Sequence, residues 1–293
     1  MRQILFALAL ILSPLSLFAQ DGEREGGIIG TGIYNTGIFG TITALGSIYV
    51  NGQHVLLDPV MPVASAASDM TASDLRPGHI VAIVVVQAGD VWQALHIRQI
   101  MPLLGPVEAL SETHITVLGT QVELSGPLSA ELGDWVAVSG LWRAQTVVAS
   151  LVETVAEPPF ARISGSYFGT NEDGNDLIGD TVIIGLQTEH LREGDFVRAI
   201  GHPVPGGLEV TALETDMFGG AVGIVQAKGY LSAPRPSGLY TVLGTGLVAY
   251  TDMPAMINTQ ISSIRCGENG GLGGLDPEDS ERQELLTSLN CWN

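Results

Sequence analysis

A short glycine-centred phrase recurs four times along this chain of 293 residues. Its central glycines, Gly52, Gly119, Gly185 and Gly244, lie 67, 66 and 59 residues apart (119 − 52, 185 − 119 and 244 − 185). Apolar and polar residues alternate around them, as in residues 48–55, and a period of two is typical of a β-strand. Self-similarity at near-regular spacing indicates a row of small repeated β units instead of one large domain.

A second motif follows the first three phrases. A glycine and an aspartate precede a run of β-branched residues, as in Gly133 with Asp134 and Gly194 with Asp195, whereas the first repeat has Gly78 with His79. Glycine tolerates positive φ and aspartate can bond its own backbone, so the pair predicts a tight turn. We call it the Gly-Asp turn. Each unit is then expected to hold four short strands that form a small antiparallel barrel or curled sheet, because closure removes exposed edges.

The chain is expected to divide into these units and three further segments, two before the repeats and one after them. Along the chain these are a signal peptide at 1–19, a Gly-rich leader at 20–37, complete repeats at 38–102, 105–157 and 160–217, a degenerate fourth repeat at 220–257 that lacks the Gly-Asp half, and a tail at 258–293. The alternative for the Gly-rich segment is an added strand.

The first residues predict export. Arg2 precedes an apolar run at residues 4–12, and Ala19 offers a small residue for cleavage. The run is shorter than the roughly 20 apolar residues that span a bilayer, and the mature chain holds no second long apolar segment. The alternative is an uncleaved N-terminal anchor. We therefore expect a periplasmic or secreted protein, cleaved near Ala19, with no transmembrane segment in the mature chain.

The charge balance argues against one class of partner. The chain has 12 basic and 31 acidic residues, for a formal net charge of −19. Such a field repels phosphate backbones and anionic membrane surfaces, so nucleic-acid binding is not expected. The simplest interpretation is that the charge keeps an apolar β protein soluble.

Two cysteines, Cys266 and Cys291, lie in the tail. In an exported chain a disulfide between them is the natural interpretation, with free thiols or a metal pair as alternatives. Between them, Asp276, Pro277 and Glu278 predict the start of a short helix that runs to about Leu289.

The repeats resemble the family catalogued as domain of unknown function 5666. The resemblance rests on residues 40–52, 117–119, 133–136 and 194–197, and it covers most of 38–216. It implies an OB-like small barrel and an exported location, and it implies no activity. The expected fold is therefore all-β, with three complete OB-like repeats, one degenerate repeat and a short C-terminal helix.

Two histidines occupy repeat positions that other residues fill in the sister copies. His54 corresponds to Gln121, and His79 corresponds to Asp134. No two histidines are two, three or four residues apart, so no local metal pair exists. His54 and His79 are candidates for a repeat-specific binding site, against the alternative of ordinary surface histidines.

One loop gathers oxygen ligands. Asn171, Asp173 and Asn175 fit positions one, three and five of a calcium loop, and Asp176 beside them is a fourth candidate metal ligand. The EF-hand pattern fails, because Asp176 stands where glycine is required and Val182 where glutamate is required. The alternative to calcium is an acidic hairpin loop, and no other cofactor is indicated.

The aromatic residues suggest a third kind of site. Trp142 lies near a hairpin end and is the best candidate for an exposed platform that binds glycans, as OB-like barrels often bind oligosaccharides. The alternative places the aromatics in the core.

These observations lead to one function and two alternatives. We expect a non-catalytic binding or scaffold module of the cell envelope, with a protein or glycan partner. The alternatives are a glycan- or polymer-binding protein that uses exposed aromatics, and a hydrolase with carboxylates at a repeat junction. The chain shows no Gly-x-Ser-x-Gly elbow and no complete dinucleotide motif.

Overall fold

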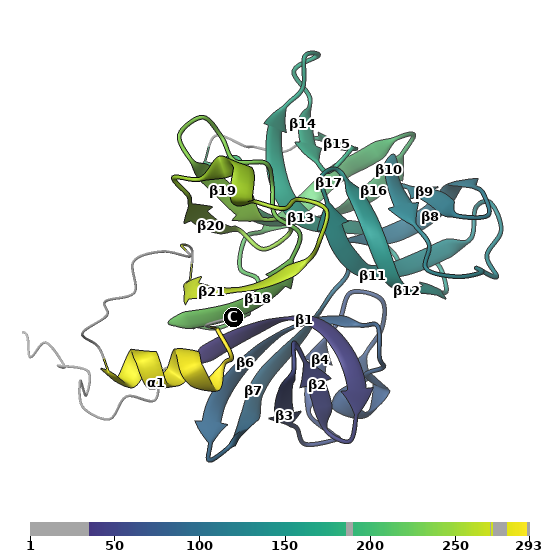
Figure 1. Cartoon of the computed structure of the whole chain (residues 1–293). Coiled ribbons are helices and arrows are strands. Elements are labelled where there is room, and N and C mark those ends of the chain that lie inside the picture. The colour runs from purple at the N-terminus through teal and green to yellow at the C-terminus, as the bar shows by residue number, and fades with distance from the viewer. Residues whose placement is uncertain (1–34, 186–189, 270, 272–279, 292–293) are drawn as a thin grey trace, which may run out of the picture. The chain divides into compact units, whose positions relative to one another are not determined.

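The computed structural model describes residues 35–185, 190–269, 271 and 280–291 (Figure 1). β-strands dominate, and the helical elements in this part of the chain are two short 3₁₀ turns and one α-helix. None of them has the length and apolar character needed to cross a membrane. The predicted signal peptide, most of the predicted leader and the helix start at 276–278 lie outside the described residues.

Three five-stranded barrels follow one another along the chain. In each, the strands close in the order first, second, third, fifth, fourth, and back to the first, and the third and fifth strands are parallel. Barrel one contains β1 (Thr36–Leu45), β2 (Ile48–Val50), β3 (Gln53–Leu56), β6 (Ile80–Ala88) and β7 (Val91–Ile100). Barrel two contains β8 (Leu103–Leu110), β9 (His114–Val117), β10 (Thr120–Glu123), β11 (Trp135–Arg143) and β12 (Thr146–Thr154). Barrel three contains β13 (Ala161–Thr170), β14 (Asp176–Ile178), β15 (Thr181–Ile184), β16 (Phe196–Val204) and β17 (Gly207–Glu214).

The prediction of three tandem OB-like barrels is confirmed, with two corrections to its details. Each barrel has five strands, because the glycine phrase is a hairpin of two short strands. The barrels are also not purely antiparallel, since the third strand lies beside the fifth in parallel. The first strand begins at Thr36, inside the segment that was expected to be a leader.

The third copy of the glycine phrase was aligned wrongly. The turn between β14 and β15 is formed by Gly179 and Asp180, six residues before Gly185, which follows β15. The structural spacing is therefore 60 residues (179 − 119). The error arose because Gly179 and Gly185 flank the same β-branched strand, so periodicity alone cannot decide which one turns the chain.

The hairpin turns of barrels one and two have the same backbone conformation. Asn51 and Gly52 have φ of 53° and 82°, and Leu118 and Gly119 have φ of 51° and 78°. Positive φ at both central residues is the type I′ pattern that matches strand twist. Gly52 faces open space, whereas a Cβ on Gly119 would overlap the carbonyl oxygen of Gly206 in barrel three. The same turn is therefore also a contact between barrels in the second copy.

This pair of turns gives a matched test. We expect Gly52→Ala to lower the free energy of unfolding by about 1–2 kcal/mol, the cost of left-handed backbone at a residue with a Cβ. Gly119→Ala should cost about 2–5 kcal/mol, since an overpacking penalty adds to the same strain. Urea unfolding of both variants measures the difference. Equal losses would show that the backbones of the two barrels do not touch there.

The insert of the first repeat adds to barrel one. It forms β4 (Pro62–Ala64), β5 (Met70–Thr71) and the 3₁₀ turn η1 (Ala72–Asp74), and β4 pairs in parallel with β7. Val63 and Ala72 are buried in the core of this barrel. The insert is therefore an integral part of barrel one, although proline, alanine and serine dominate its sequence.

The fourth unit does not close a barrel. Its first strand, β18 (Ile224–Gly229), pairs in parallel with β1 of barrel one, and β21 (Ser263–Glu268) pairs with β18. The glycine phrase forms the hairpin of β19 (Leu239–Val242) and β20 (Leu247–Tyr250), and η2 (Pro254–Met256) follows it. Without a Gly-Asp half, the unit extends one barrel and packs against another.

The barrels are joined by strand pairing and by apolar packing. β8 of barrel two pairs with β13 of barrel three, and buried side chains of these two barrels form one continuous apolar cluster. A second cluster contains Phe39 and Ile80 of barrel one, Phe196 of barrel three and Leu247 of the fourth unit. Joints of this kind hold the described barrels as one packed body.

The tail is fastened to barrel one. The helix α1 (Ser280–Ser288) confirms the predicted C-terminal helix (Figure 1). Leu285, Leu286 and Leu289 pack into the core of barrel one. The predicted disulfide between Cys266 of β21 and Cys291 is present. Burying three leucines is how a short helix with little intrinsic stability is held in place.

Candidate functional site

The Gly-Asp turn has the same hydrogen bonds in all three barrels. In barrels two and three, the carboxylates of Asp134 and Asp195 accept the backbone N–H of the residue three positions earlier, at 2.9 and 2.8 Å. Self-bonding of this kind is what a short acidic side chain contributes to a tight turn. The pattern in the sequence therefore predicted both the turn and the role of its aspartate.

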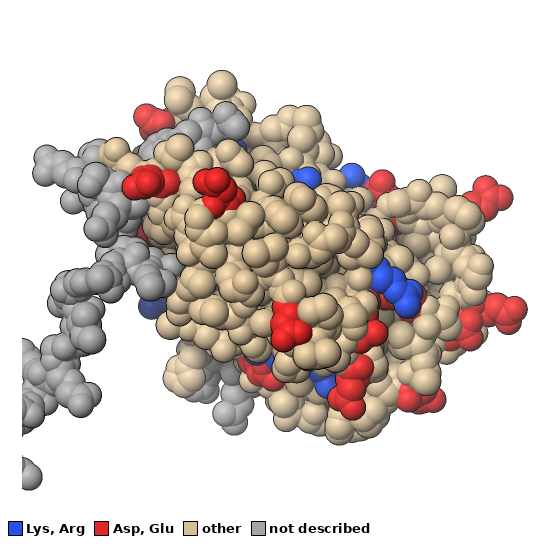
Figure 2. All heavy atoms as spheres, turned by 90° about the horizontal axis from the view of Figure 1, so that it is seen from below, with Lys and Arg blue, Asp and Glu red and all other residues tan. Residues whose placement is uncertain are grey.

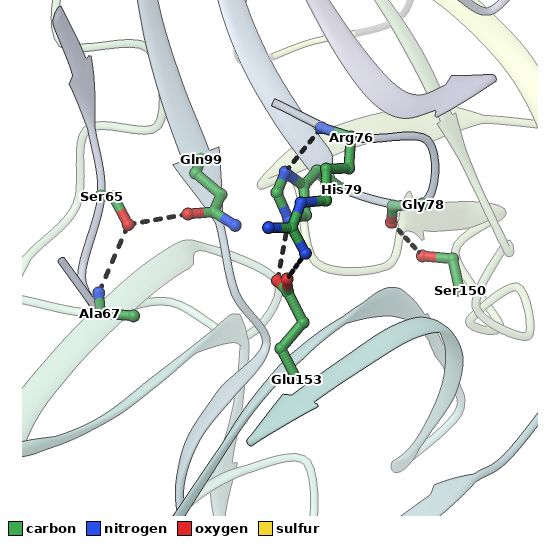
Figure 3. Close-up of polar contacts among 8 residues, drawn as sticks. All are labelled: Ser65, Ala67, Arg76, Gly78, His79, Gln99, Ser150 and Glu153. Atoms are coloured by element: carbon green, nitrogen blue, oxygen red, sulfur yellow. Dashed lines mark hydrogen bonds and ion pairs between the residues drawn. The ribbon is translucent and has the colours of Figure 1, made fainter. Parts of the chain in front are cut away.

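In barrel one the histidine keeps this bond and adds another. His79 Nδ1 accepts the N–H of Arg76 at 3.2 Å, which leaves Nε2 as the nitrogen that carries the proton. Nε2 then lies 2.9 Å from Oε2 of Glu153 on β12 of barrel two (Figure 3). The His79 side chain is 2% exposed and that of Glu153 is 28% exposed. The replacement of aspartate by histidine thus turns a local bond into a link between two barrels.

Two further bonds support this link. The Arg76 guanidinium donates to the other Glu153 oxygen at 3.0 Å, and the Ser150 hydroxyl donates to the carbonyl of Gly78 at 2.5 Å (Figure 3). The Glu153 carboxylate therefore accepts hydrogen bonds from a histidine and an arginine of the same turn. We call His79, Arg76 and Glu153 the junction triad.

A cavity of about 290 Å³ lies beside the triad. The first-repeat insert lines one side with Asp69, Met70 and Asp74, and barrel two contributes residues of β11 and β12. Asp74 accepts the backbone N–H and the hydroxyl of Thr71 at 2.8 and 2.9 Å. These hydrogen bonds, the backbone one first, hold the pKa of Asp74 below its usual value.

His79 has no ring nitrogen left to act as a general base. A general base needs a ring nitrogen that can reach a substrate proton, and a nucleophile must sit beside that base. Nδ1 of His79 is bonded to a backbone N–H and Nε2 to Glu153, so both nitrogens are engaged. The arrangement can hold two barrels together, and it offers His79 no free position for proton transfer.

Comparison with known families bears on barrel two. Residues 105–153 match the family described as domain of unknown function (DUF5666). The DUF5666 segment begins within β8 and ends at Glu153, so it spans this barrel and includes the carboxylate of the junction triad. No curated protein and no solved structure matches the chain.

Trp142 lies inside the DUF5666 segment, and the prediction that it is exposed is wrong. Its side chain is 3% exposed, and its indole N–H donates to the carbonyl of Ser164 in barrel three at 2.8 Å. A Cβ added at Gly165, Gly179 or Gly244 would collide with the indole. The ring is buried because glycines of barrel three and of the fourth unit leave room for it, which periodicity within one repeat cannot reveal.

The other predicted ligands lie in separate places. His54 stacks on Tyr49 with ring centroids 4.6 Å apart, on β3 and β2 of barrel one, while His79 belongs to the junction triad. The structure therefore gives the two histidines different neighbours instead of a common site.

The oxygen-rich loop uses its side chains within barrel three. Asn171 Oδ1 accepts the backbone N–H groups of Asp173 and Asn175, and Asp176 Oδ1 accepts the Tyr167 hydroxyl at 2.6 Å. In the described part of the chain, no group of three or more His, Cys, Asp or Glu side chains is placed to hold a metal ion. A calcium site at these residues stays a prediction.

Sequence reasoning missed a larger cavity and the partner of His79. A cavity of about 540 Å³ lies between barrel three and the β19–β20 hairpin, lined by Phe168, Arg192, Tyr240 and others. Its walls come from segments far apart in the chain, and no motif links them. No motif identified Glu153 as the partner of His79 either. The histidine in place of an aspartate was a signal that the Gly-Asp turn of barrel one differs from the other two.

The charged groups form no large patch on the face shown in Figure 2. Acidic side chains there are dispersed among uncharged residues. This dispersal agrees with the interpretation that the negative charge keeps the protein soluble.

Proposed function

We propose that the chain is an exported, non-catalytic binding or scaffold module of the cell envelope. The observation that carries this proposal is the junction triad. The one Gly-Asp turn that departs from the repeat uses its new side chain to connect barrels, with both ring nitrogens occupied. A histidine with both ring nitrogens bonded in this way stabilises the packing of the barrels and has no free nitrogen for catalysis.

Other departures from the repeat support the same function. The first-repeat insert lines the cavity at the junction of barrels one and two, β18 of the fourth unit adds to barrel one, and α1 packs into the core of barrel one. Where the copies differ, the differences serve to assemble a single body. A packed assembly of this kind suits a protein that presents surfaces to a partner.

Two features support export. The signal-peptide pattern at residues 1–19 remains a sequence prediction, because these residues lie outside the described ones. A disulfide such as the one between Cys266 and Cys291 persists in oxidising compartments such as the periplasm.

The junction triad also provides the test. We expect Glu153→Gln and His79→Asn each to lower the free energy of unfolding by about 1–3 kcal/mol, since the first removes the charge from the partly buried His79–Glu153 hydrogen bond and the second removes its donor. Asparagine can still accept the Arg76 N–H as aspartate does in the sister turns. Arg76→Gln is the matched control: its side chain is 67% exposed, so the loss should stay below about 1 kcal/mol.

The same variants separate scaffold from hydrolase. Wild type and Glu153→Gln are incubated with chromogenic esters, phosphate esters and glycosides, and product release is followed by absorbance. We expect no turnover above the buffer rate for either protein. Turnover by the wild type that disappears in Glu153→Gln would overturn the non-catalytic function and favour carboxylate chemistry at the repeat junction.

A further inference from the structure

Three arginines from two barrels converge on one carboxylate. Arg98 lies on β7 of barrel one, and Arg162 and Arg198 lie on β13 and β16 of barrel three. Arg198 forms an ion pair with Glu214, and Arg98 Nη1 lies 4.0 Å from the same carboxylate. The side chains of Arg98 and Arg198 are only 12% and 15% exposed. Partly buried guanidinium groups are therefore concentrated where barrels one and three meet.

The positive charge of this cluster exceeds the negative charge beside it. The carboxylates that act electrostatically on these arginines are Glu214 and Asp216, which leaves three positive charges against two negative ones. Asp216 also accepts the backbone N–H of Phe218 at 3.0 Å. In a chain with a net charge of −19, a local excess of positive charge requires a physical explanation.

The hydrogen-bonding capacity of the cluster is only partly filled: Arg98 Nη1 donates to the carbonyl of Asp216 at 2.5 Å, and Arg198 donates to Glu214. A guanidinium group presents five N–H donors, and Nε of Arg98, Arg162 and Arg198 is buried with no partner among the described residues. Nε2 of His96 is also buried without a hydrogen-bond partner among the described residues. It lies next to Gly219, and the charge of Arg98 acts on the ring. Unpaired buried donors are costly, and several of them together are typical of a site that takes an acceptor.

The electrostatics of the cluster point the same way. Burial first, and then repulsion from Arg198, lower the pKa of Arg98, and the same two causes lower the pKa of Arg162. A bound anion would offset both costs, because it adds negative charge and accepts hydrogen bonds. Arginine is well suited to this, since its planar fork matches the oxygens of phosphate, sulfate and carboxylate.

We infer that Arg98, Arg162 and Arg198 form a binding site for a small dissolved oxyanion, such as phosphate or sulfate, that bridges barrels one and three. The site is separate from the junction triad and goes beyond the proposed function, so either can fail alone. The guanidinium groups of Arg98 and Arg198 are mostly buried, and the net negative charge of the protein repels an anionic membrane surface. Both observations favour a dissolved ion over the headgroup of a membrane lipid.

The test uses the mature, disulfide-bonded chain and inorganic phosphate. Thermal unfolding is recorded in phosphate and in NaCl of equal ionic strength, and isothermal titration calorimetry gives the dissociation constant. For the wild type we expect phosphate at about ten times that constant to raise the midpoint by about 3 °C. Arg162→Gln should weaken binding by about tenfold, since a charge-assisted bond is lost.

Matched variants keep the result interpretable. Arg143→Gln removes another partly buried arginine that pairs with a glutamate, in barrel two, and it should bind phosphate as the wild type does. Arg162→Lys keeps the charge and loses the fork, so it should bind with intermediate affinity, and it serves if Arg162→Gln does not fold. An equal shift in Arg162→Gln, or no heat and no shift in the wild type, would overturn the site.

Vesicles distinguish the source of the phosphate. We expect no co-sedimentation of the wild type with phosphatidic acid vesicles beyond that of Arg162→Gln. Co-sedimentation that depends on Arg162 would overturn the assignment to a dissolved ion in favour of a lipid headgroup.

Discussion

Replacing Trp142 with alanine is expected to lower the free energy of unfolding by about 3–5 kcal/mol, the usual cost of truncating a buried aromatic side chain. The indole is 3% exposed and packs among core residues of barrels two and three, such as Ile163 and Ile178. Its N–H is bonded to Ser164 across the barrel boundary. The variant therefore loses apolar contacts and leaves a buried carbonyl without its donor.

Graded variants separate these two losses. Trp142→Phe retains a ring and removes the N–H donor, so its loss should be smaller, about 1–3 kcal/mol. Phe160→Ala, at an aromatic that is 36% exposed, is the control and should change stability by less than about 1 kcal/mol. Equilibrium unfolding in guanidinium chloride measures all three. Wild-type stability of Trp142→Ala would mean that the indole is not the shared core residue of barrels two and three.

Reducing the Cys266–Cys291 disulfide is expected to destabilise the protein by about 3 kcal/mol, from the loop-entropy estimate for a sequence separation of 25 residues. The bond connects β21 to Cys291, three residues after the end of α1. Leu286 of α1 and Leu289, which follows the helix, are 2% and 0% exposed in the core of barrel one. Gln226 of β18 adds a bond to the carbonyl of Leu289 at 2.6 Å. Release of the helix would therefore expose apolar surface of barrel one.

The measurement compares urea unfolding with and without a reductant. A chain with both Cys266→Ser and Cys291→Ser should match the reduced wild type and should not respond to the reductant, which controls for other effects of the reagent. Identical unfolding of the oxidised and reduced wild type would show that packing of the leucines alone holds α1.

The repeated features were predictable because they are local. The Gly-Asp turn needs only a residue that tolerates positive φ and a side chain that accepts the backbone N–H of the residue three positions earlier. Gly133 and Asp134 meet both requirements, so the turn is predictable from the sequence. Alternating β-branched residues identified the strands and, with the turns, the small barrels. The disulfide followed from two cysteines in a chain with an export signal.

The candidate sites were less predictable because they are formed between repeats. Nothing in the sequence distinguishes Glu153 from the other acidic residues. It becomes the partner of His79 only because barrels one and two pack against each other. The convergence of Arg98 with Arg198 joins strands 100 residues apart (198 − 98), and no spacing rule connects them. Trp142 was assigned to the surface because its covering glycines belong to other units.

The amino-acid sequence by itself determined the unit with its strands and turns, because φ preferences and periodicity act within about 60 residues (179 − 119). It also determined the disulfide of the tail, which follows from two cysteines in a chain with an export signal. Only the tertiary structure decided how the units join, which put Trp142 in a shared core, His79 against Glu153 and three arginines around one carboxylate. The physical reason is that contacts between barrels depend on the shape and charge of surfaces that are far apart in the chain. Local sequence patterns do not indicate which of these surfaces pack against each other.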